Sequence, residues 1–212
     1  MKKILILFVC LFIFVGCGKT ESKLKKATGI TTEQEEQIKK ILSESGFGND
    51  IVKIEHDELL DGAYSKEGKG YRADFRLDGN SGVSNVTLYL TKDNNLERIR
   101  YNTKNFYENN EVVDNVRNYV ILPSEKNEYV RFCTRNIESL LKAPSTAKFP
   151  NISNWRVGKN NGEVIVQSYV DAQNGFGAMI RSQFQFVIDT KTNMVTSLIF
   201  DGTEYIKQSK KK

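Results

Sequence analysis

Histidine and cysteine are scarce in this chain, and their scarcity excludes most metal and redox sites. Among 212 residues there are one histidine and three cysteines. Cys10 and Cys17 lie in or directly after an N-terminal apolar run, so Cys133 is the only thiol left and no intrachain disulfide is available. His56 stands among carboxylates, but in a strand only Glu58 would share its face. Two such ligands do not make a zinc site, so we expect no metal and no cofactor.

Motifs of common catalytic machineries are also missing. The chain has no Gly-x-Ser-x-Gly sequence, which presents the nucleophile in many serine hydrolases. Residues 18–20 read Gly-Lys-Thr, as at the end of a phosphate-binding loop, but that loop needs glycine where Ile13 stands. The carboxylates between residues 57 and 61 lack the spacing of a calcium loop. We therefore expect a protein that is not an enzyme.

Long hydrophobic runs are absent after the N-terminus. The chain begins Met-Lys-Lys, and residues 4–16 are then almost entirely isoleucine, leucine, phenylalanine and valine. This run is shorter than the roughly 20 residues that a membrane-spanning helix needs. A basic start, a short apolar run and a small residue at its end are typical of a secretory signal.

The end of the signal carries a more specific pattern. Phe14-Val15-Gly16-Cys17 resembles a bacterial lipobox, although Phe14 replaces the usual leucine. This resemblance implies that residues 1–16 are a lipoprotein signal peptide and that Cys17 receives a diacylglycerol. Two acyl chains suffice for stable anchoring. We therefore expect a protein anchored to the cell membrane on its extracytoplasmic face.

Positive charge is mild and gathers near the ends of the mature chain. The formal charge is +5, and removal of Lys2 and Lys3 leaves 5 − 2 = +3. Lysines cluster between residues 19 and 26 and between 207 and 212. Such clusters contact anionic lipid or cell-wall polymer, or serve only as solvated ends. No basic face with interleaved aromatic residues is present, so we expect no nucleic-acid partner.

The periodicity predicts an α+β fold that begins after a tether. Residues 17–30 are polar and lysine-rich, which is typical of a flexible tether. Thr32 and Glu35 have the spacing of a capping box at a helix start. The period then changes to two, and each strand has one polar face, which favours antiparallel pairing. The predicted strands of this first unit, residues 31–104, are 51–58, 71–78, 86–90 and 96–101.

A second unit of the same kind is predicted over residues 124–206, after a connector at 105–123 that holds a short helix. Ser124 is expected to cap its helix, and Ala143-Pro144 to end it. Cys133 falls on the apolar face of this helix, where we expect it to fill the core. Strands follow near 155–157, 163–170, 181–188 and 194–200, and a basic tail occupies 207–212. The fold class is thus two tandem helix-plus-antiparallel-sheet (α-β-β-β) units.

The two units also share a turn. Each contains a Thr-Lys dipeptide followed by asparagine, at Thr91 and at Thr190, before its closing strand. A tandem duplication explains this order. The alternative is reuse of the same few residues in hairpin turns; of the two, we favour related units.

Two blocks in the second unit resemble a known sequence module. Residues 140–150 read LLKAPSTAKFP, and residues 169–181 read YVDAQNGFGAMIR. Together they are similar to an uncharacterised module of bacterial and phage-borne proteins, over roughly residues 126–200. That family has no assigned activity, so the resemblance implies a fold and a context only.

The second block supplies the candidate site. Asp171 and Arg181 flank a connection rich in glycine and asparagine and are placed to pair across a hairpin. Rigid loops often carry function, so Asn174 and Phe176 are candidates for partner binding. The alternative, which we favour from sequence alone, is a demanding turn that fixes register and buries Phe176.

Three functional hypotheses remain from the sequence. The first is a lipid-anchored, non-enzymatic protein that binds another envelope protein or a cell-wall polymer. The second is exclusion or immunity on behalf of a phage or mobile element, because the resembling module is found in phage-borne proteins. The third, which we weight least, is an envelope hydrolase that uses His56.

Overall fold

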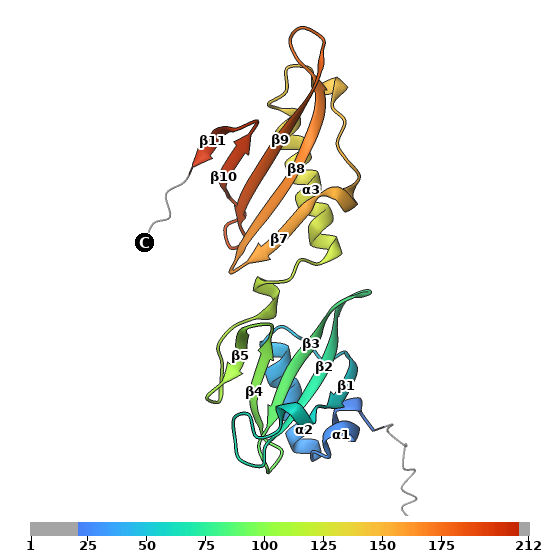
Figure 1. Cartoon of the computed structure of the whole chain (residues 1–212), viewed down its shortest axis with the longest axis vertical. Helices are drawn as coiled ribbons and strands as arrows, with labels where there is room; N and C mark the ends of the chain where they lie inside the picture. The colour runs from blue at the N-terminus through green and yellow to red at the C-terminus, as the bar shows by residue number, and fades with distance from the viewer. Residues whose placement is uncertain (1–20, 208–212) are drawn as a thin grey trace, which may run out of the picture.

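The computed structural model describes residues 21–207 and contains helices and two antiparallel sheets, of six and five strands. This confirms the predicted α+β class. The two sheets follow each other along the longest axis of the molecule, each with its own hydrophobic core (Figure 1). The proposed signal peptide and Cys17 lie outside the described residues.

The first unit is a helical layer on a meandering sheet. Every strand pairs with its neighbours in sequence, in the order β1 to β6. Its elements are α1 (Lys23–Thr28), α2 (Thr32–Glu44), β1 (Ile51–His56), η1 (Glu58–Leu60), β2 (Lys69–Asp78), β3 (Ser81–Leu90), β4 (Leu96–Tyr101), β5 (Lys104–Glu108) and β6 (Glu111–Val112).

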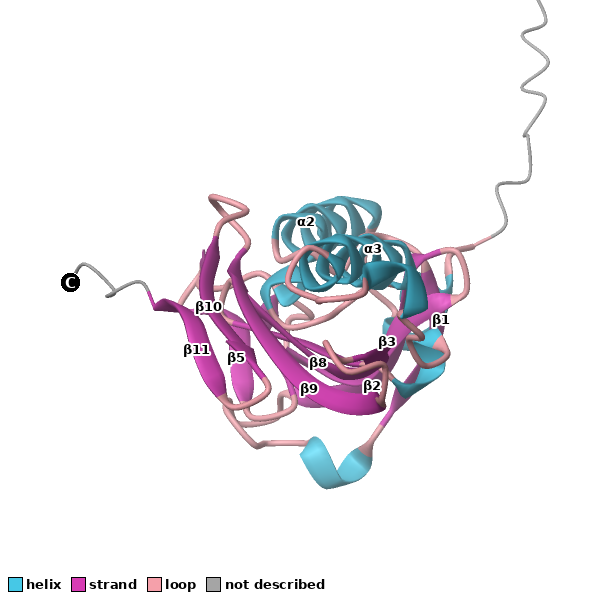
Figure 2. Ribbon diagram, turned by 90° about the horizontal axis from the view of Figure 1, so that it is seen from above, coloured by secondary structure: helices cyan, strands magenta, loops and turns pink. Residues whose placement is uncertain are grey.

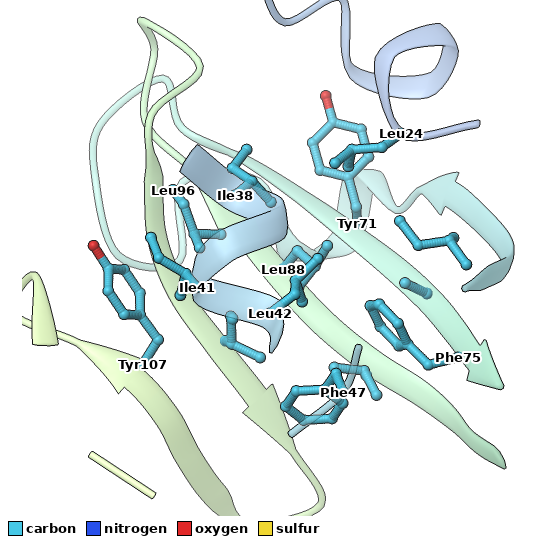
Figure 3. Packing of buried hydrophobic residues seen from close by; sticks show 14 of the residues in the cluster. Leu24, Ile38, Ile41, Leu42, Phe47, Tyr71, Phe75, Leu88, Leu96 and Tyr107 are labelled. Atoms are coloured by element: carbon cyan, nitrogen blue, oxygen red, sulfur yellow. The ribbon is translucent and has the colours of Figure 1, made fainter. Parts of the chain in front are cut away.

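The N-cap of helix α2 is one residue earlier than the predicted Thr32. Thr31 is the N-cap, and its hydroxyl and the Gln34 side chain form the reciprocal capping box. The sequence contains this spacing twice in succession, so the pattern alone does not choose between Thr31 and Thr32. One face of α2 buries Ile38, Ile41 and Leu42 against the sheet (Figure 3).

The predicted tether is wrong for its second half. Residues Lys23–Thr28 form α1, with Ser22 as N-cap and Gly29 in the left-handed conformation at its end. Leu24 and Ile30 belong to the first core, at 1% and 2% exposure. The polar, lysine-rich composition of the segment indicated a tether, but its two apolar residues are buried in the core of the first unit.

The predicted connector is also largely part of the first unit. Strands β5 and β6 extend the sheet, and Phe106, Tyr107 and Val116 are buried in its core. The short helix expected near residue 116 exists as one 3-10 turn, η2 (Val116–Asn118). The asparagine- and glutamate-rich composition reflects tight turns, where Asn109 and Asn110 have positive φ.

The second unit repeats the arrangement with five strands in the order β11-β10-β9-β8-β7. Its core buries Cys133, Trp155, Phe184 and Phe186 between helix and sheet. Its elements are α3 (Pro123–Glu138), η3 (Pro144–Thr146), η4 (Ile152–Asn154), β7 (Arg156–Asn160), β8 (Glu163–Gln173), β9 (Met179–Asp189), β10 (Val195–Phe200) and β11 (Thr203–Lys207).

Helix α3 differs from the prediction at both ends. Its N-cap is Leu122, and Pro123 occupies the first helical position, where its fixed φ suits a helix start. Ser124 therefore does not cap the helix, and its hydroxyl lies 3.1 Å from a carboxylate oxygen of Asp78 in the first unit. The helix ends at Glu138, before Ala143-Pro144.

The two units have the same topology, a helix followed by an antiparallel meander. Helices α2 and α3 lie on the same side of the molecule, so the helix-free faces of both sheets turn to the other side (Figure 2). The shared turns occupy equivalent places, between β3 and β4 and between β9 and β10, with Asn94 and Asn193 at positive φ. Duplication as the origin of this likeness stays a prediction.

Candidate functional site

His56, at the end of β1, pairs with the carboxylate of Asp61. Its Nε2 lies 2.9 Å from a carboxylate oxygen of Asp61, which also accepts the amide of Gly70. Glu58, the expected neighbour of His56, begins η1 instead of continuing the strand, so it does not share the histidine's face. The Gly70 amide first, and then His56, lower the pKa of Asp61. Residues 21–207 contain no cluster of three metal-ligating side chains.

Cys133 is a core residue and not a nucleophile. It is fully buried in the second unit, as predicted from its place on the apolar face of α3. Burial disfavours the thiolate and raises the pKa of the thiol to about 12. A thiol with this pKa and no exposure is inert toward most electrophiles.

The hairpin of β8 and β9 extends well beyond its neighbours. Its pairing runs to Gln173 and Met179, next to the tip. Strand β7 begins opposite Gln167, and β10 ends opposite Phe184. The outer part of the hairpin therefore extends past both of these strands, at one end of the molecule (Figure 1).

A single side chain organises the tip. The Asn174 side-chain oxygen accepts hydrogen bonds from the amides of Phe176 at 2.9 Å and Ala178 at 3.0 Å. Gly177 has φ +84°, a conformation that glycine adopts without steric cost. The tip is thus a defined turn that holds residue 176 at its outermost point.

Phe176 is almost completely exposed, at 98%. The preferred prediction, that the turn buries this ring, is wrong. Residues 146–148 flank β8 only as far as Gln173, and β10 ends opposite Phe184, so none of the described residues 21–207 covers the ring at the tip. Met179 and Ile180, the first two residues of β9, are also about half exposed.

An ion pair braces the hairpin below the tip. The Arg181 guanidinium donates to both carboxylate oxygens of Asp171, at 2.8 and 2.7 Å, as the sequence predicts. The same guanidinium lies 3.9 Å from the ring centroid of Tyr169. Arg181 lowers the pKa of Asp171, and Asp171 in turn raises the pKa of Arg181. Three outward side chains on two strands are thereby fixed relative to one another.

The structure also brings the two sequence blocks of the resembling module together. Lys148 and Asp171 exchange backbone hydrogen bonds of 2.8 and 3.0 Å. The Thr146 hydroxyl accepts the amide of Gln173 at 2.9 Å. The first block therefore occupies the edge of β8 next to the start of β7, up to Gln173. Phe149, within this block, stacks on Trp155 and packs against the second core.

The sequence reasoning missed a second surface, on the helix-free face of the second sheet. A shallow hollow of about 630 Å³ opens there. The alternation of outward polar residues in β8 and β9 was its only signal. Side chains from β7, β8 and β9 dominate its lining, namely Arg156, Gln167, Tyr169, Gln183 and Gln185.

Comparison of the chain with protein-family models, with curated proteins and with solved structures gave no match. The resemblance of residues 126–200 to a bacterial and phage-borne module stays a prediction. Within residues 21–207, no helix has the length and apolar character needed to cross a bilayer.

Proposed function

We propose that this protein is a lipid-anchored, extracytoplasmic binding protein without enzymatic activity, and that the tip of the β8–β9 hairpin recognises another envelope protein. The exposure of Phe176 at the tip of a braced hairpin carries this proposal. The anchor is the diacylglycerol that the lipobox resemblance implies on Cys17.

The tip has the composition of an interface anchor. Aromatic side chains dominate the energetic centres of protein interfaces, because a rigid ring buries a large area with little loss of conformational entropy. Phe176 is 98% exposed, and Met179 and Ile180, the first two residues of β9, are about half exposed. Their exposure costs free energy in the isolated protein, and burial in an apolar pocket of a partner recovers it.

The hairpin is organised before it binds. Asn174 fixes the turn, and the Asp171–Arg181 pair fixes the strands below it. A recognition element that is already ordered loses less conformational entropy on association than a disordered one. This argues for a specific partner and against nonspecific adhesion.

The position of the tip agrees with an anchored protein that reaches outward. The described chain starts beside α1, at one end of the long axis, and the hairpin projects from the other end (Figure 1). A lipid attached at Cys17, close before Glu21, therefore holds the first unit near the membrane. The tip is then the part of the molecule farthest from the anchor.

Affinity capture with matched variants tests the proposal. The chain from residue 17 with Cys17→Ser serves as bait against solubilised envelope, beside the same bait with Phe176→Ala or with Leu59→Ala. Leu59 is the matched control, because it is 92% exposed but lies in the first unit. We expect one dominant protein that Phe176→Ala loses and Leu59→Ala retains. Equal capture by all three baits, or no specific capture, contradicts the proposal.

A further inference from the structure

The helix-free faces of the two sheets differ in how they are covered. In the first unit, the chain between β1 and β2, residues 57–68, folds back over this face. The burial of Tyr89 shows that this face is covered. Its side chain is only 7% exposed, although it does not belong to the core on the helix side of the sheet. The Tyr64 ring packs edge-on against Tyr89, with ring centroids 4.5 Å apart.

This covering segment is held by arginines of the sheet. The Arg98 guanidinium lies 4.0 Å from the centroid of the Tyr64 ring, and Arg100 donates to the Tyr64 hydroxyl at 3.3 Å. Asp57 accepts a hydrogen bond from Arg72 on the same face. The segment contains four carboxylates and one lysine. An acidic, tyrosine-bearing segment thus covers a sheet face that carries arginines.

The equivalent face of the second unit has no such cover among residues 21–207. Strands β7 and β8 are joined by Asn161 and Gly162 alone, both at positive φ, in a tight hairpin turn. No segment is available there to fold back. The hollow of about 630 Å³ occupies the face instead.

The lining of this hollow resembles the covered face in charge and chemistry. It includes Arg156 and no acidic residue. Arg156 is exposed and has no ion pair within residues 21–207. Gln167 and Gln185, joined by a 2.6 Å hydrogen bond, offer amide groups that pair well with a peptide backbone. Tyr169 adds an aromatic wall beneath Arg181.

We infer that this hollow binds an extended acidic peptide segment with an aromatic side chain, supplied by another protein. The occupant would take the place that residues 57–68 take on the first sheet, with a carboxylate on Arg156 and its ring in the hollow. The inference rests on the proposed binding function and names the chemistry of a second contact, separate from the hairpin tip.

The chain supplies its own probe. A fluorescein-labelled peptide with the sequence of residues 57–68, DELLDGAYSKEG, has the required acids and tyrosine. Two comparison peptides replace its acids by the matching amides or its tyrosine by alanine. Binding to the soluble chain with Cys17→Ser is measured by fluorescence anisotropy. We expect saturable binding of the parent peptide, weakened roughly three- to tenfold in each comparison peptide.

Protein variants place the binding on the hollow. Arg156→Gln is expected to weaken the parent peptide by the same roughly three- to tenfold. Arg135→Gln, an exposed arginine on α3, and Phe176→Ala at the tip are expected to leave it unchanged. Retained peptide binding in Phe176→Ala separates this inference from the proposed role of the tip.

Three outcomes overturn the inference. One is the absence of saturable binding of the parent peptide up to about 1 mM, which corresponds to about 4 kcal/mol of affinity. Another is parent-peptide binding that Arg156→Gln leaves intact. The third is binding of a cell-wall oligosaccharide, and of none of the peptides, that Arg156→Gln abolishes, since the face would then recognise glycan.

Discussion

Replacement of Leu24 by alanine distinguishes a structural α1 from a tether. Leu24 is 1% exposed and packs in the first core beside Ile30 and Ile38. Buried Leu→Ala substitutions cost about 2–5 kcal/mol, according to how far the site collapses. Because α1 is a short helix at the edge of the unit and can shift inward, we expect about 3 kcal/mol. This is a large part of the stability of a small domain.

The single tryptophan of the chain makes the assay selective. Trp155 lies in the second core, so its fluorescence reports unfolding of the second unit alone. Far-UV circular dichroism reports both units. With a urea m-value of about 1.5 kcal/mol/M for a unit of this size, Leu24→Ala shifts the first-unit midpoint by about 2 M. The tryptophan transition stays in place. Lys26→Ala, on the exposed side of α1, is the control and shifts neither.

Two results would refute this reasoning. A change below about 0.5 kcal/mol in Leu24→Ala, equal to that of Lys26→Ala, would show that the segment is a tether, as its composition indicates. An equal shift of the Trp155 transition would show that the two cores unfold as one cooperative unit.

Three further predictions concern single residues. Cys133, with a thiol pKa of about 12, stays unmodified by a thiol reagent at pH 8 in the folded Cys17→Ser protein and reacts fully in urea; rapid reaction of the folded protein contradicts its burial. Asp171 titrates below an ordinary aspartate, so the stabilisation it shares with Arg181 is present above the ordinary aspartate pKa and disappears as pH falls through the lowered value. Arg181→Gln moves the carbon-13 NMR titration midpoint of Asp171 upward, and an unchanged midpoint would assign the lowered pKa to another cause. Cys17→Ser abolishes incorporation of radiolabelled palmitate in the native cell, whereas incorporation that persists would show that the lipid lies elsewhere.

The sequence predicted those strands whose apolar residues alternate regularly and those turns that contain characteristic turn residues. Alternation identified β2, β8 and β9, and asparagines at positive φ marked both shared turns. The Asp171–Arg181 pair followed from hairpin spacing. Each of these signals is local, because neighbouring residues alone determine the geometry.

The incorrect predictions concern residues whose burial depends on distant parts of the chain. Leu24 and Phe106 are buried by elements that sequence composition does not reveal, so their segments resembled a tether and a connector. The sequence also favours a turn that buries Phe176, whereas the ring is 98% exposed. The segments that flank the hairpin, residues 146–148 beside β8 and strand β10 beside β9, stop short of the tip and leave it exposed. The hollow depends on the missing cover between β7 and β8, and only comparison of the two units reveals it.

The central claim is that the tip of the β8–β9 hairpin contacts a specific envelope protein. Site-specific photo-crosslinking in the native cell tests it most directly, with benzoylphenylalanine at position 176 and, as matched control, at the equally exposed position 59. The account predicts one dominant crosslinked protein from position 176 that is absent from position 59. Crosslinks that are absent from position 176, or the same at both positions, would contradict it.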